Sequence, residues 1–318
     1  MWRWLFAPAV CIAACSTVTA STADGDARSD VTMTWVEKYV TYRQNHRDEL
    51  SLTDVHFLAE IIFDGDHDFD AIEAAVYENN SAKPLATYGG ADKRAFTNGL
   101  YYTRKTRSFD APEDLERRHP ADTTFVWTIS GPSGEFELDP IRIGGTEGET
   151  RVPAVSTIRL RQNDERVADY EALDPSQPLT ISWDPFTIGS PLEGTEWNDW
   201  VFVLVSDCSG NVVYTSGAPE DDDFVDYTET SATAPAGRLQ PGQRYVVFIS
   251  QVNTVDHNIS HGITQLAANS FATELPVRTR GATKSDICAG ESKPAQYLWT
   301  RKTRGDAMET WPTVADYW

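Results

Sequence analysis

Four aspartates at alternate positions are the first residues whose type and spacing suggest chemistry. They are Asp64, Asp66, Asp68 and Asp70. Calcium prefers several oxygen ligands at ~2.3–2.6 Å, and a loop with alternating carboxylates can provide them. The loop is not an EF-hand, because Phe69 and Ala75 stand where that motif needs glycine and glutamate. The run predicts either a calcium-binding loop or a solvated acidic turn.

Two histidines four residues apart, His257 and His261, could share a metal ion if they lay on a helix. The surrounding residues instead predict a surface loop between strands, and Asn258 stands where a zinc protease would carry its glutamate. The chain also has no GxSxG elbow, P-loop or GxGxxG motif. We therefore assign no catalytic residue and favour a non-enzymatic role.

Two further pairs of side chains are candidates for bonding or binding. Cys208 and Cys288 could form a disulfide in an oxidising compartment, although their spacing alone cannot show that they meet. Trp197 and Trp200 flank the start of a predicted strand. Exposed indoles can stack on sugars or fill pockets of a partner, so these two are candidate ligand-binding residues. The alternative is that both pack inside the protein.

The first residues of the chain have the pattern of an export signal. A basic start is followed by an apolar stretch too short to span a bilayer, which predicts a signal peptide over residues 1–14. Residues 12–15 resemble a bacterial lipobox, and the resemblance implies cleavage before Cys15 and a lipid on its sulfur. Cleavage after Ala20 is the alternative. Residues 15–31, rich in small and polar residues, predict a flexible tether.

The charge of the chain limits the expected binding partners, and the export signal indicates the expected location. The net charge of −21 over 318 residues makes nucleic acid and anionic lipid surfaces poor partners. We expect contact with a membrane only through the lipid anchor. The expected location is the cell envelope, at the outer membrane or cell surface, with periplasmic or secreted locations as alternatives. An envelope protein or a glycan is the expected partner.

Residues 32–148 predict a mostly-β domain with one short helix. Residues 55–63 alternate apolar and other residues with period two, and residues 71–77 predict a return strand. The helix is predicted near residues 110–118, where Asp110 can cap it and Pro112 suits its first turn. Residues 31–50 predict either a short amphipathic helix or an irregular first strand. A glycine-rich linker ends this domain.

Residues 149–281 predict a second all-β domain with seven short strands. Leu239, Pro241 and Tyr245 stand in an order that resembles the fibronectin type III signature, and Trp183 resembles the core tryptophan of that family's second strand. The resemblance covers about residues 155–281. It implies a β-sandwich in which the Tyr245 hydroxyl bonds to upstream backbone.

Residues 282–318 form an aromatic-rich extension that does not have the pattern of a strand. Residues 300–304 repeat the pentapeptide of residues 103–107, Thr-Arg-Lys-Thr-Arg. The chain as a whole is thus predicted to be all-β, with two tandem sandwich-like domains and one short helix. Three functions follow as hypotheses: adhesion, scaffolding or ligand binding in the envelope; carbohydrate binding or processing; and service as a subunit of an envelope assembly. Only calcium is considered as a cofactor.

Overall fold

Strands make up nearly all of the regular structure in this protein. The computed structural model describes residues 31–63, 72–89, 94–95, 101–131, 134–144, 153–193, 198–207, 212–216, 224–282 and 309–310. Within these ranges the one helix is α1 (Pro112–Arg118), and the remaining elements are strands. The prediction of an all-β fold with one short helix in the first half is confirmed.

The largest sheet, sheet A, has nine strands and contains four long ones: β1 (Val31–Gln44), β2 (Leu50–Phe63), β16 (Arg244–Ser260) and β17 (Ile263–Arg278). The order is β14-β13-β16-β17-β1-β2-β6-β18, and β5 also pairs with β6. The shorter strands are β5 (Arg94–Ala95), β6 (Tyr101–Ser108), β13 (Trp200–Asp207), β14 (Val212–Thr215) and β18 (Glu309–Thr310). Neighbouring long strands are antiparallel except β1 and β17, which are parallel.

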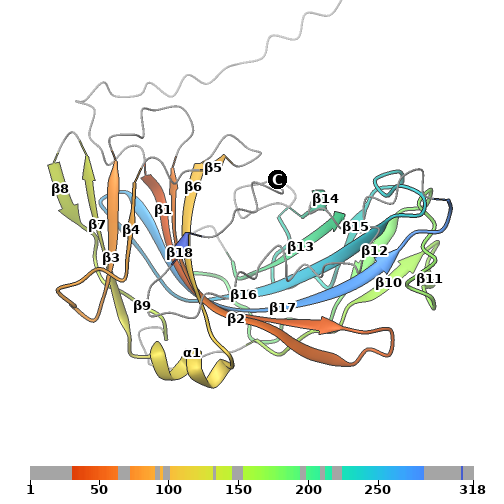
Figure 1. Cartoon of the computed structure of the whole chain (residues 1–318), viewed down its shortest axis with the longest axis horizontal. Helices are drawn as coiled ribbons and strands as arrows, with labels where there is room; N and C mark the ends of the chain where they lie inside the picture. The colour runs from red at the N-terminus through yellow and green to blue at the C-terminus, as the bar shows by residue number, and fades with distance from the viewer. Residues whose placement is uncertain are drawn as a thin grey trace, which may run out of the picture.

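Two smaller sheets complete the architecture. Sheet B has the order β4-β3-β7-β8 with β9 also paired to β7, and sheet C has the order β11-β10-β12-β15. Sheet B consists of β3 (Glu73–Glu78), β4 (Ala86–Tyr88), β7 (Thr124–Gly131), β8 (Gly134–Glu137) and β9 (Ile141–Arg142). Sheet C consists of β10 (Arg159–Gln162), β11 (Glu165–Arg166), β12 (Leu179–Ser182) and β15 (Ser231–Ala234). Figure 1 shows sheet B at one end of the molecule and sheet C at the other.

Sheets B and C each close a hydrophobic core against sheet A. The first core joins Trp127 and Ile129 of sheet B to Phe57 of β2 and Ala267 of β17. The second core joins sheet C to β13, the beginning of β16 and the end of β17, where Leu275 is buried. Ala267 and Leu275 are an even number of residues apart on β17, so both cores use the same face of this strand. We call this the first face of sheet A.

The sandwich formed by sheet C resembles the fibronectin type III fold in its strand order. Strands β10, β12 and β15 face β14, β13, β16 and β17, giving seven strands in two antiparallel sheets. Tyr245, buried on β16, accepts a hydrogen bond from the backbone N–H of Gln240 at 2.6 Å. The indole N–H of Trp183 donates to the Glu229 carbonyl at 3.1 Å. Both bonds fix loops between the two sheets.

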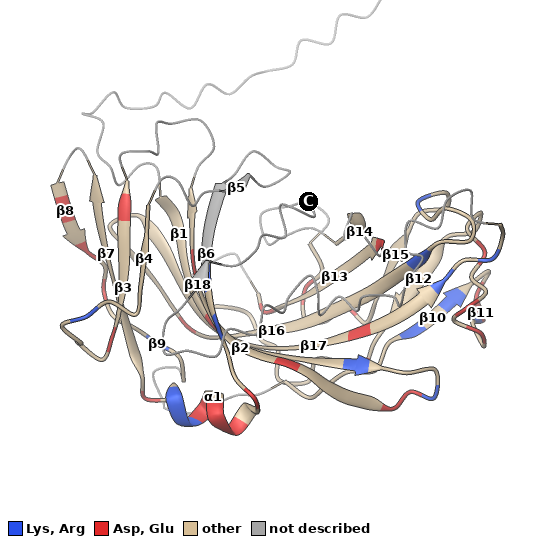
Figure 2. Cartoon of the chain, in the orientation of Figure 1, with Lys and Arg blue, Asp and Glu red and all other residues tan. Residues whose placement is uncertain are grey.

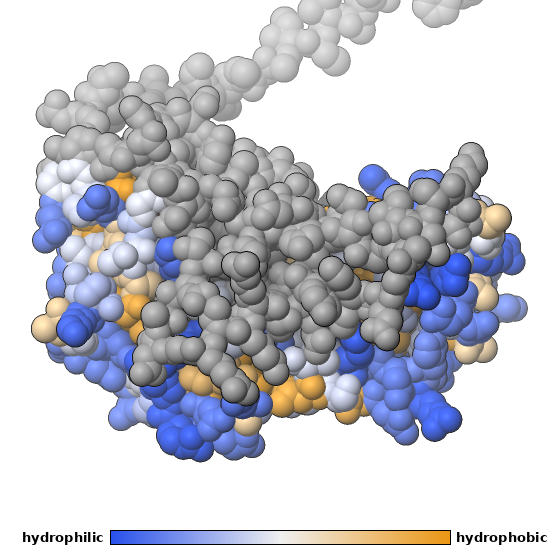
Figure 3. All heavy atoms as spheres, viewed as in Figure 1, coloured by the Kyte–Doolittle hydropathy of each residue, from blue (hydrophilic) through white to orange (hydrophobic). Residues whose placement is uncertain are grey.

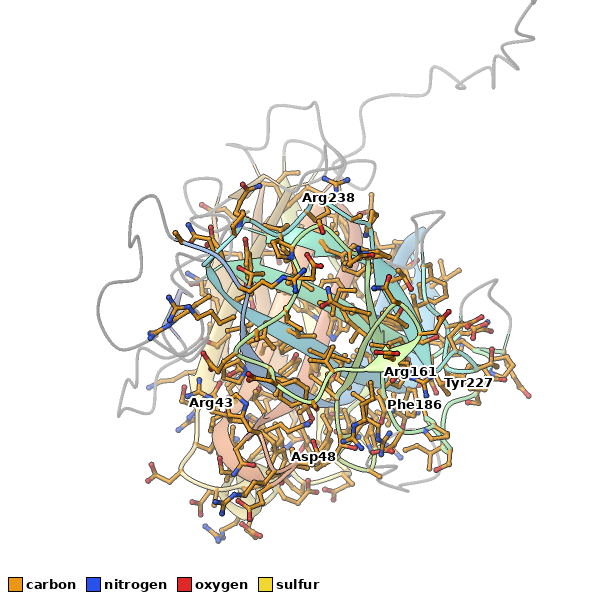
Figure 4. All side chains as sticks on the ribbon, turned by 90° about the vertical axis from the view of Figure 1, so that its right-hand side faces the viewer. Arg43, Asp48, Arg161, Phe186, Tyr227 and Arg238 are labelled. Atoms are coloured by element: carbon orange, nitrogen blue, oxygen red, sulfur yellow. The ribbon has the colours of Figure 1, made fainter. Side chains whose placement is uncertain are left out.

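The hairpin of β1 and β2 links the two sandwiches directly. The Gln44 side chain donates to the Ile158 carbonyl at 2.8 Å and accepts from the Ile158 N–H at 2.6 Å. In the turn of the hairpin, Asp48 pairs with Arg166 of β11 at 2.9 Å. Figure 4 shows Arg43 and Asp48 at the lower part of the end that carries sheet C. Sheet A itself also crosses the predicted domain boundary at residues 148–149, because it contains strands from both sides of that boundary.

The short helix α1 forms where it is predicted, but Asp110 does not cap it, because the N-cap residue is Ala111 and no side chain makes a cap hydrogen bond. Pro112 stands in its first turn, acidic Glu113 and Asp114 follow, and its last turn is basic, which matches the helix dipole. Both signs of charge are visible on α1 in Figure 2. Leu115 is buried, and Glu116 pairs with Lys38 of β1 at 2.6 Å. The helix thereby covers the end of the first core.

The structure corrects two local predictions and decides between the alternatives of a third. Residues 71–77 do not return beside residues 55–63, because β3 pairs with β4 and β7 in sheet B. The segment around His257 is not a loop, since His257 lies in β16 and only His261 lies in the turn to β17. Residues 31–44, for which a helix was one alternative, form the regular strand β1. Residues 71–77 pair with a strand that lies far away in the sequence, whereas β16 pairs with the adjacent β17, and β1 pairs both with the adjacent β2 and with the distant β17.

The surface of the described residues differs in hydropathy between the two ends of the molecule. On the side viewed in Figure 3, hydrophilic residues predominate at the right-hand end, and hydrophilic and hydrophobic residues mix at the left-hand end. Among the described residues, no helix combines the length and the apolar character needed to cross a membrane.

Candidate functional site

The candidate site is the second face of sheet A, which is the face turned away from sheets B and C. Alternate residues of the long strands point there, among them Trp35 on β1, Leu58 on β2, Phe248 on β16 and Ala272 on β17. These side chains form two buried apolar clusters that sheets B and C do not touch. A sheet with one covered face normally alternates apolar and polar residues, so a second apolar face is unexpected in an antiparallel sandwich.

Aromatic rings occupy one half of this face. Trp35 and Trp200 meet edge to face with their ring centroids 5.3 Å apart. Phe202 of β13 and Phe248 of β16 have centroids 6.4 Å apart, and Phe224 lies 6.5 Å from Trp200. Trp200 is 3% exposed and Phe248 is 4% exposed. Such rings provide a large contact area with defined geometry.

Polar groups occupy the adjoining half, on β1, β2 and β17. The ring of His56 stacks on Tyr39 with centroids 4.8 Å apart, and His56 Nδ1 lies 2.8 Å from an oxygen of Asp54. Ser270 of β17 donates a hydrogen bond to the Glu37 carboxylate. All five side chains are buried or nearly so. Because buried polar groups cost free energy unless they are bonded, these pairs must form together with the sheet.

Glu274 is the most perturbed group on the second face. Its side chain is 1% exposed, and one of its oxygens lies 3.6 Å from Nη2 of Arg43. Burial raises the pKa of Glu274 from 4.5 to about 7; Arg43 lowers this pKa and Asp54 raises it. The distance from Arg43 is too long for a direct hydrogen bond. This carboxyl group therefore gains and loses its proton near neutral pH.

The arrangement suits the binding of a segment with complementary chemistry. Buried carboxylates beside aromatic rings suit a cationic and aromatic segment, because cations pair with the first and stack on the second. Among the described residues, no group of three or more His, Cys, Asp or Glu side chains is arranged to hold a metal ion. The face is thus best described as an apolar surface with an acidic half.

Several predicted site residues fall outside the part of the chain that the structure describes. They are Cys15, Asp64, Asp66, Asp68, Asp70, Trp197, Cys208 and Cys288. The lipid anchor, the calcium-binding loop and the disulfide therefore stay predictions.

The remaining predicted residues are all placed in the fold. Trp183, Leu239 and Tyr245 belong to the second core, and Pro241 lies in the loop that precedes β16. Trp200 lies on the second face and is buried there rather than exposed on the outer surface. A role for Trp197 and Trp200 in ligand binding stays a prediction.

Sequence reasoning did not single out Arg43, Asp54, His56 or Glu274. A signal for His56 was present, because the alternation that sends residues 55, 57 and 59 to the core sends residues 56, 58 and 60 to the opposite face. The sequence does not indicate that this opposite face is buried as well. Glu274 meets Arg43 only because β17 and β1 are neighbours, with Arg43 in register with Glu274.

Comparison with known proteins adds no family. No family model matches the chain, and no curated protein matches it. Among solved structures, the chicken CNTN1 FN1–FN3 domains align at 10% identity over 80% of this chain and 67% of theirs, with a TM-score of 0.21. The BSP domain of a biofilm-associated protein aligns at 10% identity over 83% of this chain and 68% of its own, with a TM-score of 0.15. Alignments at such TM-scores do not establish a shared fold.

The class of this protein follows from its own strands. It is an all-β protein in which a fibronectin type III-like sandwich and a second sandwich share one long sheet.

Proposed function

We propose that this protein is a non-enzymatic component of the cell envelope that serves in adhesion or scaffolding. Export with a lipid anchor on Cys15 is part of the proposal. The main support is the continuity of sheet A through both sandwiches, because β16 and β17 contribute side chains to both cores. A body built in this way resists bending between its halves, which suits a protein that transmits load or holds a fixed spacing.

Two contacts add to the stiffness that the proposal requires. The bond between Tyr245 and Gln240 fixes the crossover of the fibronectin type III-like sandwich, and Gln44 joins the first hairpin to the start of β10. Sandwiches of this type mostly bind or space other molecules, although fold alone does not determine function. The acidic outer surface favours partners with basic patches.

Cell fractionation tests the location. The wild-type chain should partition with the envelope, and the Cys15→Ser variant should move to the soluble fraction because it cannot accept a lipid there. Equal partitioning of the two variants would contradict the anchor and leave cleavage after Ala20 as the alternative.

A binding experiment paired with a turnover assay tests the activity. The purified exported chain should bind isolated envelopes saturably, with weaker binding at high salt, because exposed charges are screened. Incubation with a panel of envelope polysaccharides should release no fragments. Clear hydrolysis or elimination would instead support the carbohydrate-processing hypothesis.

A further inference from the structure

The second face of sheet A is buried although the described residues provide almost no layer over it. Its two clusters include a single described side chain from outside sheet A, Phe224. Neighbouring rings shield part of Trp200 and Phe248, which are 3% and 4% exposed, but Glu274 on the polar half of the face is also only 1% exposed. Large exposed apolar patches are also rare on monomeric proteins. The face therefore needs a covering element.

The described strand β18 shows where the end of the chain returns to sheet A. Glu309 pairs with Thr106 and Thr310 pairs with Lys105, so β18 forms the edge of the sheet beside β6. The row of register partners through Glu309 runs from Thr106 to Leu58, then to Glu37, then to Ala268. The C-terminal part of the chain is thus held at the far edge of the sheet, level with Ala268.

Residues 283–308 must connect β17 to this edge. Arg278 lies ten residues beyond Ala268 on β17, or ~33 Å along the strand, and four strand spacings add ~19 Å across the sheet. A connection of about 26 residues can extend to ~85 Å, so its length is ample. Sheets B and C occupy the first face of sheet A. The open route between the two points is across the second face.

The composition of this connection complements the face it would cross. Glu37, Asp54, Glu60 and Glu274 place four carboxylates on the second face, each at most 8% exposed. The connection carries a basic run, Arg301, Lys302 and Arg304, and the aromatic residues Tyr297 and Trp299. Buried carboxylates are stable when a cation is close, and aromatic rings suit the tryptophan-rich half of the face.

We propose that the second face of sheet A is the docking surface for the protein's own C-terminal segment, residues 283–308, with β18 as its clasp. The aromatic residues of the segment cover the apolar half, and its basic run pairs with the acidic half. The segment thus provides a third layer over the long sheet. It also keeps an acidic, aromatic surface away from other copies of the chain.

Two adjacent alanines on β17 allow a matched test. Ala268 belongs to a cluster on the second face, whereas Ala267 belongs to the first core under sheet B. In a background with Cys208→Ser and Cys288→Ser, the Ala268→Cys and Ala267→Cys variants are labelled with a maleimide. Both are made in the full exported chain and in a chain that ends at Ala282. Removal of the segment should raise the labelling rate of the Ala268→Cys variant by at least about tenfold and leave the Ala267→Cys variant slow, because local exposure governs access.

Equal labelling of the Ala268→Cys variant in the long and short chains would overturn the proposal. The proposal would also be overturned if the Ala268→Cys variant stays protected in the short chain and size-exclusion chromatography shows that this chain is a dimer. A second copy would then be the occupant of the face. Fast labelling of the Ala267→Cys variant would show that the short chain has unfolded. In that case the charge-reversal variants of the full chain test the proposal.

In the full chain, the double change Arg301→Glu and Arg304→Glu should raise the labelling rate of the Ala268→Cys variant. The matched change Lys284→Glu and Lys293→Glu, in the same segment but outside the basic run, should have a smaller effect. If both changes leave the labelling rate at the wild-type value, or if the matched change has the larger effect, the proposed pairing is wrong.

Discussion

At the scale of single residues, Glu274 connects the fold of this protein to pH. Burial on the second face raises the pKa of its carboxyl group to about 7, with Arg43 lowering this pKa and Asp54 raising it. In the unfolded chain the group has its ordinary pKa of 4.5. The folded state therefore binds a proton more tightly than the unfolded state. This contribution to stability is fully present below about pH 4.5 and is lost as the pH rises through 7.

The Glu274→Gln variant should remove this loss. Between pH 4.5 and pH 8 the wild type should lose on the order of 3 kcal/mol of unfolding free energy relative to the variant. Urea unfolding of both proteins at several pH values measures the difference. The Glu165→Gln variant, on the exposed strand β11, is the control and should follow the wild type. A difference between variant and wild type that is the same at every pH would contradict the role of Glu274.

Tyr245 illustrates a residue whose role is structural. The Tyr245→Phe variant loses the bond from the Gln240 N–H while keeping the ring in the second core. Its unfolding free energy should fall by about 1 kcal/mol, the usual net value of one hydrogen bond. The Tyr227→Phe variant is a control, because the Tyr227 hydroxyl has no hydrogen-bond partner among the described residues. Equal losses in the two variants would mean that the bond at Tyr245 contributes nothing specific.

At the scale of elements, the hairpin of β16 and β17 determines how far sheet A extends. Its turn places His261 at φ 54° and Gly262 at φ 80°, so both residues are left-handed, as in the tight turns that suit twisted strands. The strands continue on either side without interruption except for one register shift near Thr254. Because of this turn, β16 and β17 extend from the fibronectin type III-like sandwich into the first core.

The Gly262→Ala variant should destabilise the protein by about 1 kcal/mol, because alanine tolerates this backbone conformation poorly. The cost is conformational, since a Cβ at Gly262 would meet no atom within 4 Å. The Gly89→Ala variant is a matched control: a Cβ there also meets open space, but the backbone is not left-handed. Thermal unfolding of both variants should show a loss only for Gly262→Ala, and equal melting temperatures would contradict the argument.

At the scale of the whole molecule, the two sandwiches should unfold together. They share the hydrogen bonds of β16, β17 and β1, and the Gln44 side chain bridges to Ile158. Separate domains joined by a linker would instead melt independently. Calorimetry of the wild type should therefore show one main transition for the described body. Two well-separated transitions would contradict a shared sheet.

The Gln44→Ala variant should lower this single transition without splitting it. It leaves the N–H and the carbonyl of Ile158 without their partner, and each such buried group costs ~1–3 kcal/mol. The Gln162→Ala variant provides a comparison, because Gln162 bonds the N–H and carbonyl of Asp174 in the same way within the second sandwich. Both variants should be destabilised, and calorimetry should show one transition for each. An unchanged stability of Gln44→Ala would show that the bridge does not couple the halves.

The sequence by itself determined the local features of this protein. The period-two pattern of residues 55–63 specified a strand and its inward face, and Pro112, which suits a first helical turn, marked where the helix begins. The order of Trp183, Leu239, Pro241 and Tyr245 specified a fibronectin type III-like sandwich. These signals come from the covalent backbone and from nearest neighbours in the chain, so they survive without knowledge of the fold.

Only the tertiary structure decided which strands are neighbours and what each face touches. An alternating pattern defines two faces, but it does not say that both are buried or that β17 lies beside β1. Arg43, Asp54 and Glu274 meet because sheet A brings together strands from opposite ends of the described chain. The pairing of distant strands depends on how the whole molecule packs, and a local pattern in the sequence does not contain that information. For this reason the acidic and aromatic second face could be recognised only from the tertiary structure.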